Sequence, residues 1–178
     1  MFHRSERLLL RPIWPEDWPA IKAGIADLQV LRHLASAPYP YHDKDAQEFT
    51  RRPIAPGCVR FLVTRAVDAE VLGTIGIDLS PTGEPELGYW IARAHWGHGY
   101  ATEAGLGAIK VAQVLGHNRL IASHFVDNPA SGKVLRKLGF VATGQVNDRF
   151  SLGRGEEAPA ADFELALQRD NRAMKCAA

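Results

Sequence analysis

Residues 86–104, ELGYWIARAHWGHGYATEA, run from a strand pattern through a turn containing Gly97 and Gly99 into a helix. Glycine lets the backbone bend tightly or approach another group closely. The helix that follows presents unpaired amide hydrogens and the positive end of its dipole, which together favour an anion such as phosphate. A plain strand-to-helix turn without a ligand is the alternative, and the residues downstream decide between the two.

Length and composition predict a single globular domain. The chain has 178 residues, of which 46% are hydrophobic and 23% charged, a mixture that can bury a core. We expect one domain over residues 1–169 and a frayed tail over residues 170–178. The net charge of +1 excludes a molecule that binds nucleic acid or acidic membranes through its overall charge, so any bound anion must be met locally.

Cysteine and histidine spacing argues against a metal site. Cys58 and Cys176 lie far apart, which is neither a disulfide framework nor a metal-binding spacing. His95 and His98 have no third ligand near them in the sequence, and a catalytic zinc needs about three protein ligands. The N-terminus lacks a signal-peptide core, and no apolar run reaches the roughly 20 residues that span a bilayer. We therefore expect a cytoplasmic protein with neither a metal nor a membrane partner.

Apolar periodicity and turn residues predict alternating strands and helices. The expected strands cover residues 7–14, 60–66, 70–79, 84–93, 119–126, 140–146 and 161–168. The expected helices start at Pro15, at Leu28, at Ala101 and at Pro129, and a further helix that reaches Arg52 is capped by Asp43 or Asp45. Gly73 and Gly76 within a strand indicate a bulge or a close backbone approach, and residues 153–159 read as a mobile loop. This order is that of an α/β protein with a mixed sheet covered by helices.

A second strong helix start lies downstream of the glycine-containing turn. Asn128 stands at the cap position and Pro129 at the first helical position, where its missing amide hydrogen is no loss. Ser131 stands where its amide can reach the cap side chain, and Gly139 closes the helix.

Four segments together resemble the GCN5-related N-acetyltransferase (GNAT) superfamily, and within it the RimJ/RimL-like group that acetylates the N-termini of ribosomal proteins. They are SERLLLRP (residues 5–12), ELGYWI (86–91), WGHGYATE (96–103), and the helix from NPAS (128–131) to KLGF (137–140). Their order and expected secondary structure match over nearly the whole chain. The resemblance implies the GNAT fold, a mixed, mostly antiparallel sheet of about seven strands that is flanked by helices and splayed between strands 4 and 5.

The resemblance also implies an acetyl-coenzyme A site in the splayed region. Backbone groups of Ile91, Ala92 and Arg93 would pair with the pantetheine arm. Asn128 and Ser131 would lie near the pantetheine and the thioester. The pyrophosphate would be bound by backbone amides of Gly97, His98, Gly99, Tyr100, Ala101 and Thr102. The side chains of Lys133 and Lys137 would reach coenzyme phosphate. For Arg136 a solvated side chain is the better interpretation.

Two positions depart from the pattern of the wider superfamily. A tyrosine on the last helix often protonates the departing thiolate there, and this chain has Leu135 at the matching position. Leucine has no proton to donate, so we assign contact with the sulfur to Ser131, as the ribosomal-type group implies. Trp96 stands where glutamine or arginine is usual, which removes a side-chain donor from the turn but leaves its backbone donors in place.

Acetyl transfer to an amine needs a neutral amine, a positioned carbonyl, and stabilised charge on oxygen and then sulfur. Glu86 is the first candidate for the base, directly or through water, because it begins the strand that lines the cleft. An exposed strand-end carboxylate is the alternative for Glu86. His124 is the second candidate, with a structural histidine as its alternative, and Tyr41 is the expected wall of the acceptor side. For Glu103 the helix dipole alone is explanation enough.

We therefore expect an enzyme that transfers an acetyl group from acetyl-coenzyme A to a primary amine of a protein N-terminus, an amino acid or a small molecule. A non-catalytic module that senses acyl-coenzyme A is the alternative, because Leu135 replaces the usual tyrosine. Binding without turnover across an amine panel, unchanged by Glu86→Gln or Ser131→Ala, would favour the sensor. The sequence decides neither the identity of the amine nor between a monomer and a homodimer.

Overall fold

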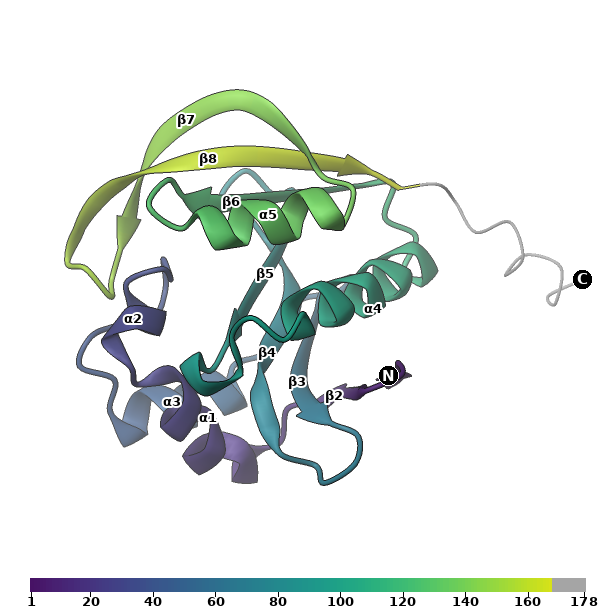
Figure 1. The fold of residues 1–178 in the computed structure, drawn as a ribbon, viewed down its shortest axis with the longest axis vertical. Coiled ribbons are helices and arrows are strands. Elements are labelled where there is room, and N and C mark those ends of the chain that lie inside the picture. The colour runs from purple at the N-terminus through teal and green to yellow at the C-terminus, as the bar shows by residue number, and fades with distance from the viewer. Residues whose placement is uncertain (168–178) are drawn as a thin grey trace, which may run out of the picture.

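An eight-stranded sheet forms the centre of the computed structural model, which describes residues 1–167. Its strand order is β1-β2-β3-β4-β5-β6-β8-β7, and all neighbours are antiparallel except β5 and β6, which run parallel (Figure 1). The strands are β1 (His3–Arg4), β2 (Leu8–Pro12), β3 (Val59–Arg65), β4 (Val71–Leu79), β5 (Pro85–Ile91), β6 (Arg119–Phe125), β7 (Val141–Ser151) and β8 (Glu156–Ala166).

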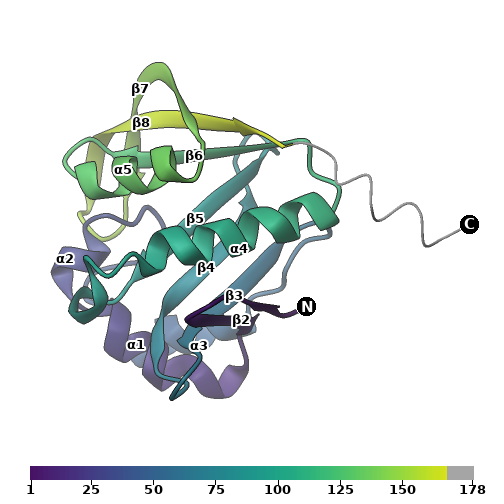
Figure 2. The ribbon, with the colours of Figure 1, turned by 45° about the vertical axis from the view of Figure 1, so that its right-hand side comes forward.

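Helices cover both faces of this sheet. They are η1 (Pro15–Asp17), α1 (Trp18–Ile25), α2 (Leu28–Leu31), α3 (Asp43–Arg51), η2 (Arg93–His95), α4 (Tyr100–Val114) and α5 (Pro129–Lys137), of which η1 and η2 are single 3-10 turns. The helices α4 and α5 lie on one face (Figure 2), and α1 to α3 lie on the other. The sheet therefore separates an N-terminal group of helices from the two helices expected near the coenzyme.

Each face of the sheet has its own hydrophobic core. Leu87 and Ile91 of β5 belong to a buried cluster that includes Ala108 of α4. Trp90 of β5 belongs to a second cluster that includes Ile21 of α1. Successive strand residues point to opposite faces, so β5 contributes side chains to both cores.

The strands β5 and β6 part soon after they meet. Their ladder within the described chain consists of the single pair Glu86 and Ile121. Beyond it the two strands diverge (Figure 1), so the splay expected between strands 4 and 5 is confirmed. A diverging strand presents backbone donors and acceptors without a neighbour, so this gap can take an extended ligand.

Close backbone approach explains the two strand glycines, as predicted. A Cβ placed on Gly73 would lie 2.1 Å from the carbonyl oxygen of Trp90, and one on Gly76 would lie 2.7 Å from that of Val59. The register between β3 and β4 also shifts next to Gly73, which marks a bulge. Both alternatives offered for these glycines are therefore present.

The C-terminal strands differ from the prediction. Residues 141–151 and 156–166 form a long hairpin, so the strand limits 140–146 and 161–168 and the loop at 153–159 were wrong. Most β7 side chains are exposed, so this strand is defined by its pairing with β8 and lacks the apolar alternation that reveals a half-buried strand. The eighth strand is β1, only two residues long. The predicted tail at residues 170–178 lies outside the described residues.

The start of α3 also corrects a prediction. Neither Asp43 nor Asp45 is the N-cap, because His42 occupies that position. The Asp45 carboxylate instead accepts a hydrogen bond from the His42 amide at 2.7 Å, as the third residue of a capping box does.

Candidate active site

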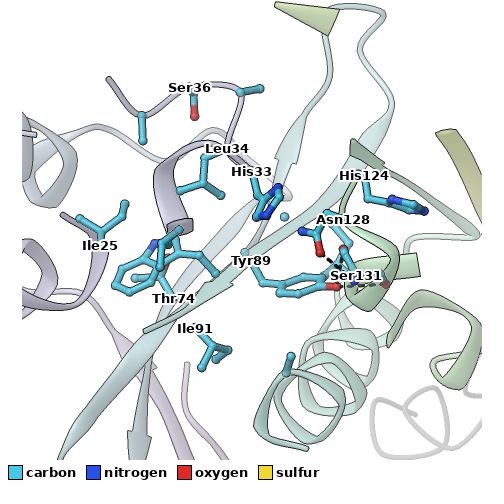
Figure 3. Close-up of a pocket in the computed structure, with 18 of the residues that line it drawn as sticks. Ile25, His33, Leu34, Ser36, Thr74, Tyr89, Ile91, His124, Asn128 and Ser131 are labelled. Atoms are coloured by element: carbon cyan, nitrogen blue, oxygen red, sulfur yellow. Dashed lines mark hydrogen bonds between the residues drawn. The ribbon is translucent and has the colours of Figure 1, made fainter. Parts of the chain in front are cut away.

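A cavity of about 1220 Å³ lies where β5 and β6 separate, and both faces of the sheet contribute to its lining. The N-termini of α4 and α5 line it on one side and Tyr41 on the other. In Figure 3, Ile25 and Leu34 lie on the side of the N-terminal helices, and Asn128 and Ser131 lie on the side of α5. One cavity therefore connects the two faces through the gap in the sheet.

The turn at residues 96–99, called here the glycine turn, depends on two residues with positive φ. Gly97 has φ of 78° and Gly99 has φ of 79°, a backbone conformation that residues with a side chain rarely adopt. Gly99 is the N-cap of α4, so the amides of Tyr100, Ala101 and Thr102 have no acceptor within the helix. All three residues line the cavity. Amides in this position, together with the helix dipole, are able to bind an anion at the edge of the cavity.

The indole of Trp96 fixes the glycine turn to the end of β5. Its Nε1 donates a hydrogen bond to the carbonyl oxygen of Ile91 at 2.7 Å. The indole N–H of Trp96 therefore holds the turn in place, a role that was not predicted from the sequence.

The edge of β5 that faces the gap is formed by Tyr89 and Ile91. The Ala92 amide donates to the carbonyl oxygen of Leu72 at 2.8 Å, across the pair formed with β4. Pairing partners alternate along an antiparallel strand, so the backbone groups of Tyr89 and Ile91 point away from β4 and into the gap. The amide of Ala92 is therefore not free to pair with a pantetheine arm. Arg93 already begins η2, and its side chain is exposed.

The Glu103 carboxylate ties the glycine turn to the N-terminal strands. It accepts hydrogen bonds from Ser5 Oγ at 2.7 Å, from the Arg7 amide at 2.8 Å and from Arg7 Nε at 2.7 Å. Arg7 also donates to the carbonyl oxygen of His98 at 3.1 Å. Burial alone would raise the pKa of Glu103, but these hydrogen bonds and the charge of Arg7 hold it below its usual value. The helix dipole is therefore not the whole explanation for Glu103. We call Ser5, Arg7 and Glu103 the Glu103 anchor.

The N-terminus of α5 brings Ser131 against Tyr89 (Figure 3). The Asn128 side chain accepts a hydrogen bond from the Ser131 amide at 3.3 Å, which is the predicted cap. The hydroxyls of Ser131 and Tyr89 are 2.8 Å apart. Burial raises the pKa of Tyr89 to about 12, and the hydrogen bond with Ser131 opposes that rise. Tyr89 was missed from sequence, although it shares a face of β5 with Leu87 and Ile91.

The rest of α5 separates packing side chains from cavity side chains. Leu135 is only 1% exposed and lies in the core beside α4, so it is a packing residue. Lys133 and Lys137 line the cavity. The guanidinium of Arg136 instead lies over the ring of Phe163, with its carbon 5.3 Å from the ring centroid. The two lysines are therefore better placed than Arg136 to contact a ligand phosphate.

On the opposite face, Glu86 forms an ion pair that the sequence analysis missed. Arg149 of β7 donates to both carboxylate oxygens of Glu86, at 2.5 and 3.1 Å, and Ser123 of β6 donates to one of them at 3.3 Å. The hydrogen bond with Glu86 raises the pKa of Arg149. The Glu86 side chain is 18% exposed, so it is not the exposed strand-end carboxylate that was the alternative. Nothing in the local sequence connects it with Arg149, 63 positions away.

A second ion pair and two glycines lie beside Glu86. Asp78 stands directly opposite Glu86 across β4 and β5, and Arg60 Nη2 donates to both of its oxygens at 3.1 Å. The next pair in this register and on this face is Gly76 with Gly88, both of which line the cavity. A Cβ on Gly88 would meet nothing within 4 Å. The floor of this side is therefore open over Gly88 and bordered by two arginine–carboxylate pairs.

The remaining candidates, His124 and Tyr41, lie on different sides of the cavity. His124 packs against Gly132 of α5, and its Nδ1 is 2.8 Å from the carbonyl oxygen of Phe125. It therefore lies on the α5 side, away from Glu86. Tyr41 is 7% exposed within the core of the N-terminal helices, and burial raises its pKa to about 12. Both residues line the cavity.

Within residues 1–167, neither a metal-binding cluster nor a membrane-spanning helix adds to this site. No group of three or more histidine, cysteine, aspartate or glutamate side chains in that range is arranged to bind a metal ion. In the same range, no helix is long and apolar enough to cross a membrane.

Comparison with known proteins agrees with the architecture. The family model described as an acetyltransferase (GNAT) domain matches residues 7–141. The uncharacterized N-acetyltransferase YoaA of Bacillus subtilis (strain 168) is 30% identical over 146 residues, which cover 79% of this chain and 82% of that protein.

Solved structures share the fold. A GNAT-family acetyltransferase from Bacillus anthracis matches with a TM-score of 0.80 and 22% identity, over 93% of this chain and 98% of that one. RimL, a ribosomal alpha-N-protein acetyltransferase solved with coenzyme A, matches with a TM-score of 0.79 and 17% identity, over 96% and 100% of the two chains.

Proposed function

This chain belongs to the GNAT acetyltransferase family, and from that premise we propose that it transfers an acetyl group from acetyl-coenzyme A to a primary amine. One observation carries the proposal. A single cavity crosses the gap between β5 and β6, with the glycine turn on one face of the sheet and Glu86 on the other. Acetyl-coenzyme A can therefore bind on one face of the sheet while the amine reaches its thioester carbonyl from the other face.

The coenzyme binds on the face covered by α4 and α5. The free amides at the start of α4 bind the pyrophosphate, which matches the charge of a helix N-terminus. The backbone groups of Tyr89 and the amide of Ile91 pair with the pantetheine arm as an added strand would, while the Ile91 carbonyl oxygen accepts from the Trp96 indole. The ammonium groups of Lys133 and Lys137, which line the cavity, bind coenzyme phosphate. With the coenzyme bound in this way, its thioester lies near Ser131, which lines the cavity.

The acceptor binds on the face of the N-terminal helices, over Gly76 and Gly88. The amine nitrogen attacks the thioester carbon, the new C–N bond forms, and the C–S bond breaks with its electron pair on sulfur. An ammonium loses one proton to solvent before attack, and the second proton, lost as the C–N bond forms, reaches Glu86 directly or through a water molecule, because each carboxylate oxygen keeps a lone pair beside its bond to Arg149. Ser131 donates a hydrogen bond to the sulfur as negative charge develops there.

The two carboxylates on the acceptor face can accept hydrogen bonds from an amine group. Asp78 and Glu86 are neighbours in register, and each is paired with an arginine, so the two pairs are neutral overall. A peptide N-terminus, an amino acid and a small polyamine-like molecule all carry such a group. The open floor over Gly88 leaves room for any of the three.

Thiol release tests the proposal. The protein is mixed with acetyl-coenzyme A and a panel of peptides with different N-terminal residues, free amino acids and polyamines, and the coenzyme A thiol is titrated with a chromogenic disulfide. We expect release with one class of amine and a loss of about 10²-fold in Glu86→Gln. Glu157→Gln, an exposed carboxylate of β8, is the matched control. Failure of acetyl-coenzyme A to bind, measured by calorimetry, would refute the proposal.

A further inference from the structure

We propose that Tyr89 is a positioning residue that holds the Ser131 hydroxyl with its proton directed at the sulfur of the leaving thiolate. The inference rests on the proposed function, because it assigns a partner to the serine that contacts sulfur. Its basis is the 2.8 Å contact between the two hydroxyls, which come from β5 and from the first turn of α5 (Figure 3).

Both ends of this contact are fixed by packing or by a cap. The Tyr89 ring packs against the buried cluster shared by β5, α4 and α5. The Ser131 amide is bound by Asn128 at 3.3 Å, which fixes the backbone that carries the hydroxyl. A hydrogen bond between two such fixed groups restricts rotation of the serine hydroxyl, and that restriction is what orients its proton.

The direction of the hydrogen bond follows from the acceptors available. A phenol is a stronger acid than an aliphatic alcohol, so Tyr89 is the better donor of the pair. Its other acceptor, the carbonyl oxygen of Ser131, is 3.5 Å away, at the limit of a hydrogen bond. Tyr89 therefore donates to Ser131 Oγ. The proton of Ser131 is left to point into the cavity, which Ser131 lines.

Tyr89 does not itself protonate the thiolate. Burial raises the pKa of Tyr89 to about 12, whereas a free thiol has a pKa of about 8.5. Transfer of the phenol proton to sulfur would therefore be unfavourable. Tyr89 keeps its proton, and its effect on the sulfur passes through Ser131.

The test is the pKa of the coenzyme A thiol when bound, which requires no acceptor. The ultraviolet absorbance of the thiolate is followed against pH in wild type, Tyr89→Phe, Ser131→Ala and the double variant. Phenylalanine keeps the ring that packs in the core and removes only the hydroxyl. Tyr39→Phe is the control, because Tyr39 is 52% exposed and lies in the loop before α3.

We expect the bound thiol pKa to rise by about one unit in Tyr89→Phe, as when a hydrogen bond to a charged group is weakened. The double variant should be no different from Ser131→Ala, because Tyr89 acts through Ser131. An unchanged pKa in Tyr89→Phe would overturn the inference. An equal rise in the presence and absence of the serine hydroxyl would overturn it as well, since Tyr89 would then act on sulfur directly.

Failure of the inference is distinguishable from failure of the proposed function. Calorimetry at pH 6, where the thiol is protonated, gives the coenzyme A affinity of each variant. Equal affinities with an unmoved thiol pKa would reject the role of Tyr89 alone. Absence of coenzyme A binding in wild type would reject the proposed function, and the inference with it.

Discussion

Replacing Glu103 with glutamine tests whether the Glu103 anchor stabilises the fold beyond the helix dipole. The carboxylate is 16% exposed and accepts three hydrogen bonds from Ser5 and Arg7. Hydrogen bonds to charged groups contribute about 1.5–3 kcal/mol, but glutamine keeps one acceptor oxygen. Arg7 is 46% exposed, so solvent weakens the ionic part. We expect Glu103→Gln to lose about 1.5 kcal/mol of unfolding free energy at pH 7, which lowers Tm by about 3–6 °C.

The sign of the pH dependence is fixed by the lowered pKa of Glu103 in the folded protein. Its contribution is complete above the pKa of an unfolded glutamate, about 4.3, and is lost as the pH falls through the lower folded pKa. The difference between wild type and Glu103→Gln should therefore shrink under acid, because a protonated glutamate and a glutamine are both neutral.

Urea denaturation at pH 7 and at decreasing pH measures both effects, with Glu16→Gln as the matched control. Glu16 is an exposed carboxylate in the first turn of η1 and has no ion pair or hydrogen bond among the described residues. We expect it to lose about 0.5 kcal/mol, the contribution of a helix dipole alone. Equal losses in the two variants, or a loss in Glu103→Gln that does not change with pH, would refute the reasoning.

Five further substitutions test packing and coenzyme binding. Leu135→Ala should lower the unfolding free energy by about 3 kcal/mol, because the Leu135 side chain is 1% exposed in the core. If urea denaturation shows a loss below about 1 kcal/mol, Leu135 is not the packing residue described above. Gly73→Ala should prevent folding or lower Tm sharply, because the added Cβ would lie 2.1 Å from a strand carbonyl oxygen. Gly88→Ala should leave Tm nearly unchanged, because a Cβ there would meet nothing within 4 Å. Thermal melts that give the two variants a similar Tm would contradict this difference. Lys133→Ala should weaken coenzyme A binding by about 3–10-fold, the effect of one charge contact. Arg136→Ala should leave the affinity unchanged. If calorimetry shows a larger loss of affinity in Arg136→Ala than in Lys133→Ala, the assignment of Lys133 is rejected.

The proposed acceptor and donor sides of the cavity were predictable to different degrees. The donor side consists of local patterns: two glycines with positive φ before a helix, and an Asn-Pro cap before another. Each pattern has its physical cause within a few neighbouring residues, so it can be recognised in one sequence. The acceptor side depends on Arg60, Asp78, Glu86 and Arg149, which come from four different strands. Its composition follows from the strand order, which no local pattern contains.

The C-terminal hairpin shows the same limit. The strand β7 has few buried side chains, so its sequence lacks the alternation that predicts a strand. Pairing with β8 extends it to Ser151, and that extension is what carries Arg149 to Glu86. Because the predicted strand ended at residue 146, it left out Arg149, the partner of the expected base.

The sequence by itself determined the glycine turn, the Asn128 cap and the helices that follow them, because hydrogen bonds and dihedral preferences within one turn of chain produce these features. Only the tertiary structure decided what the key side chains contact. Glu103 meets Arg7 across 96 positions of sequence, and Tyr89 meets Ser131 across 42. Such contacts depend on which strands become neighbours in the sheet, and that order is set by the burial of both faces together, not by any single segment.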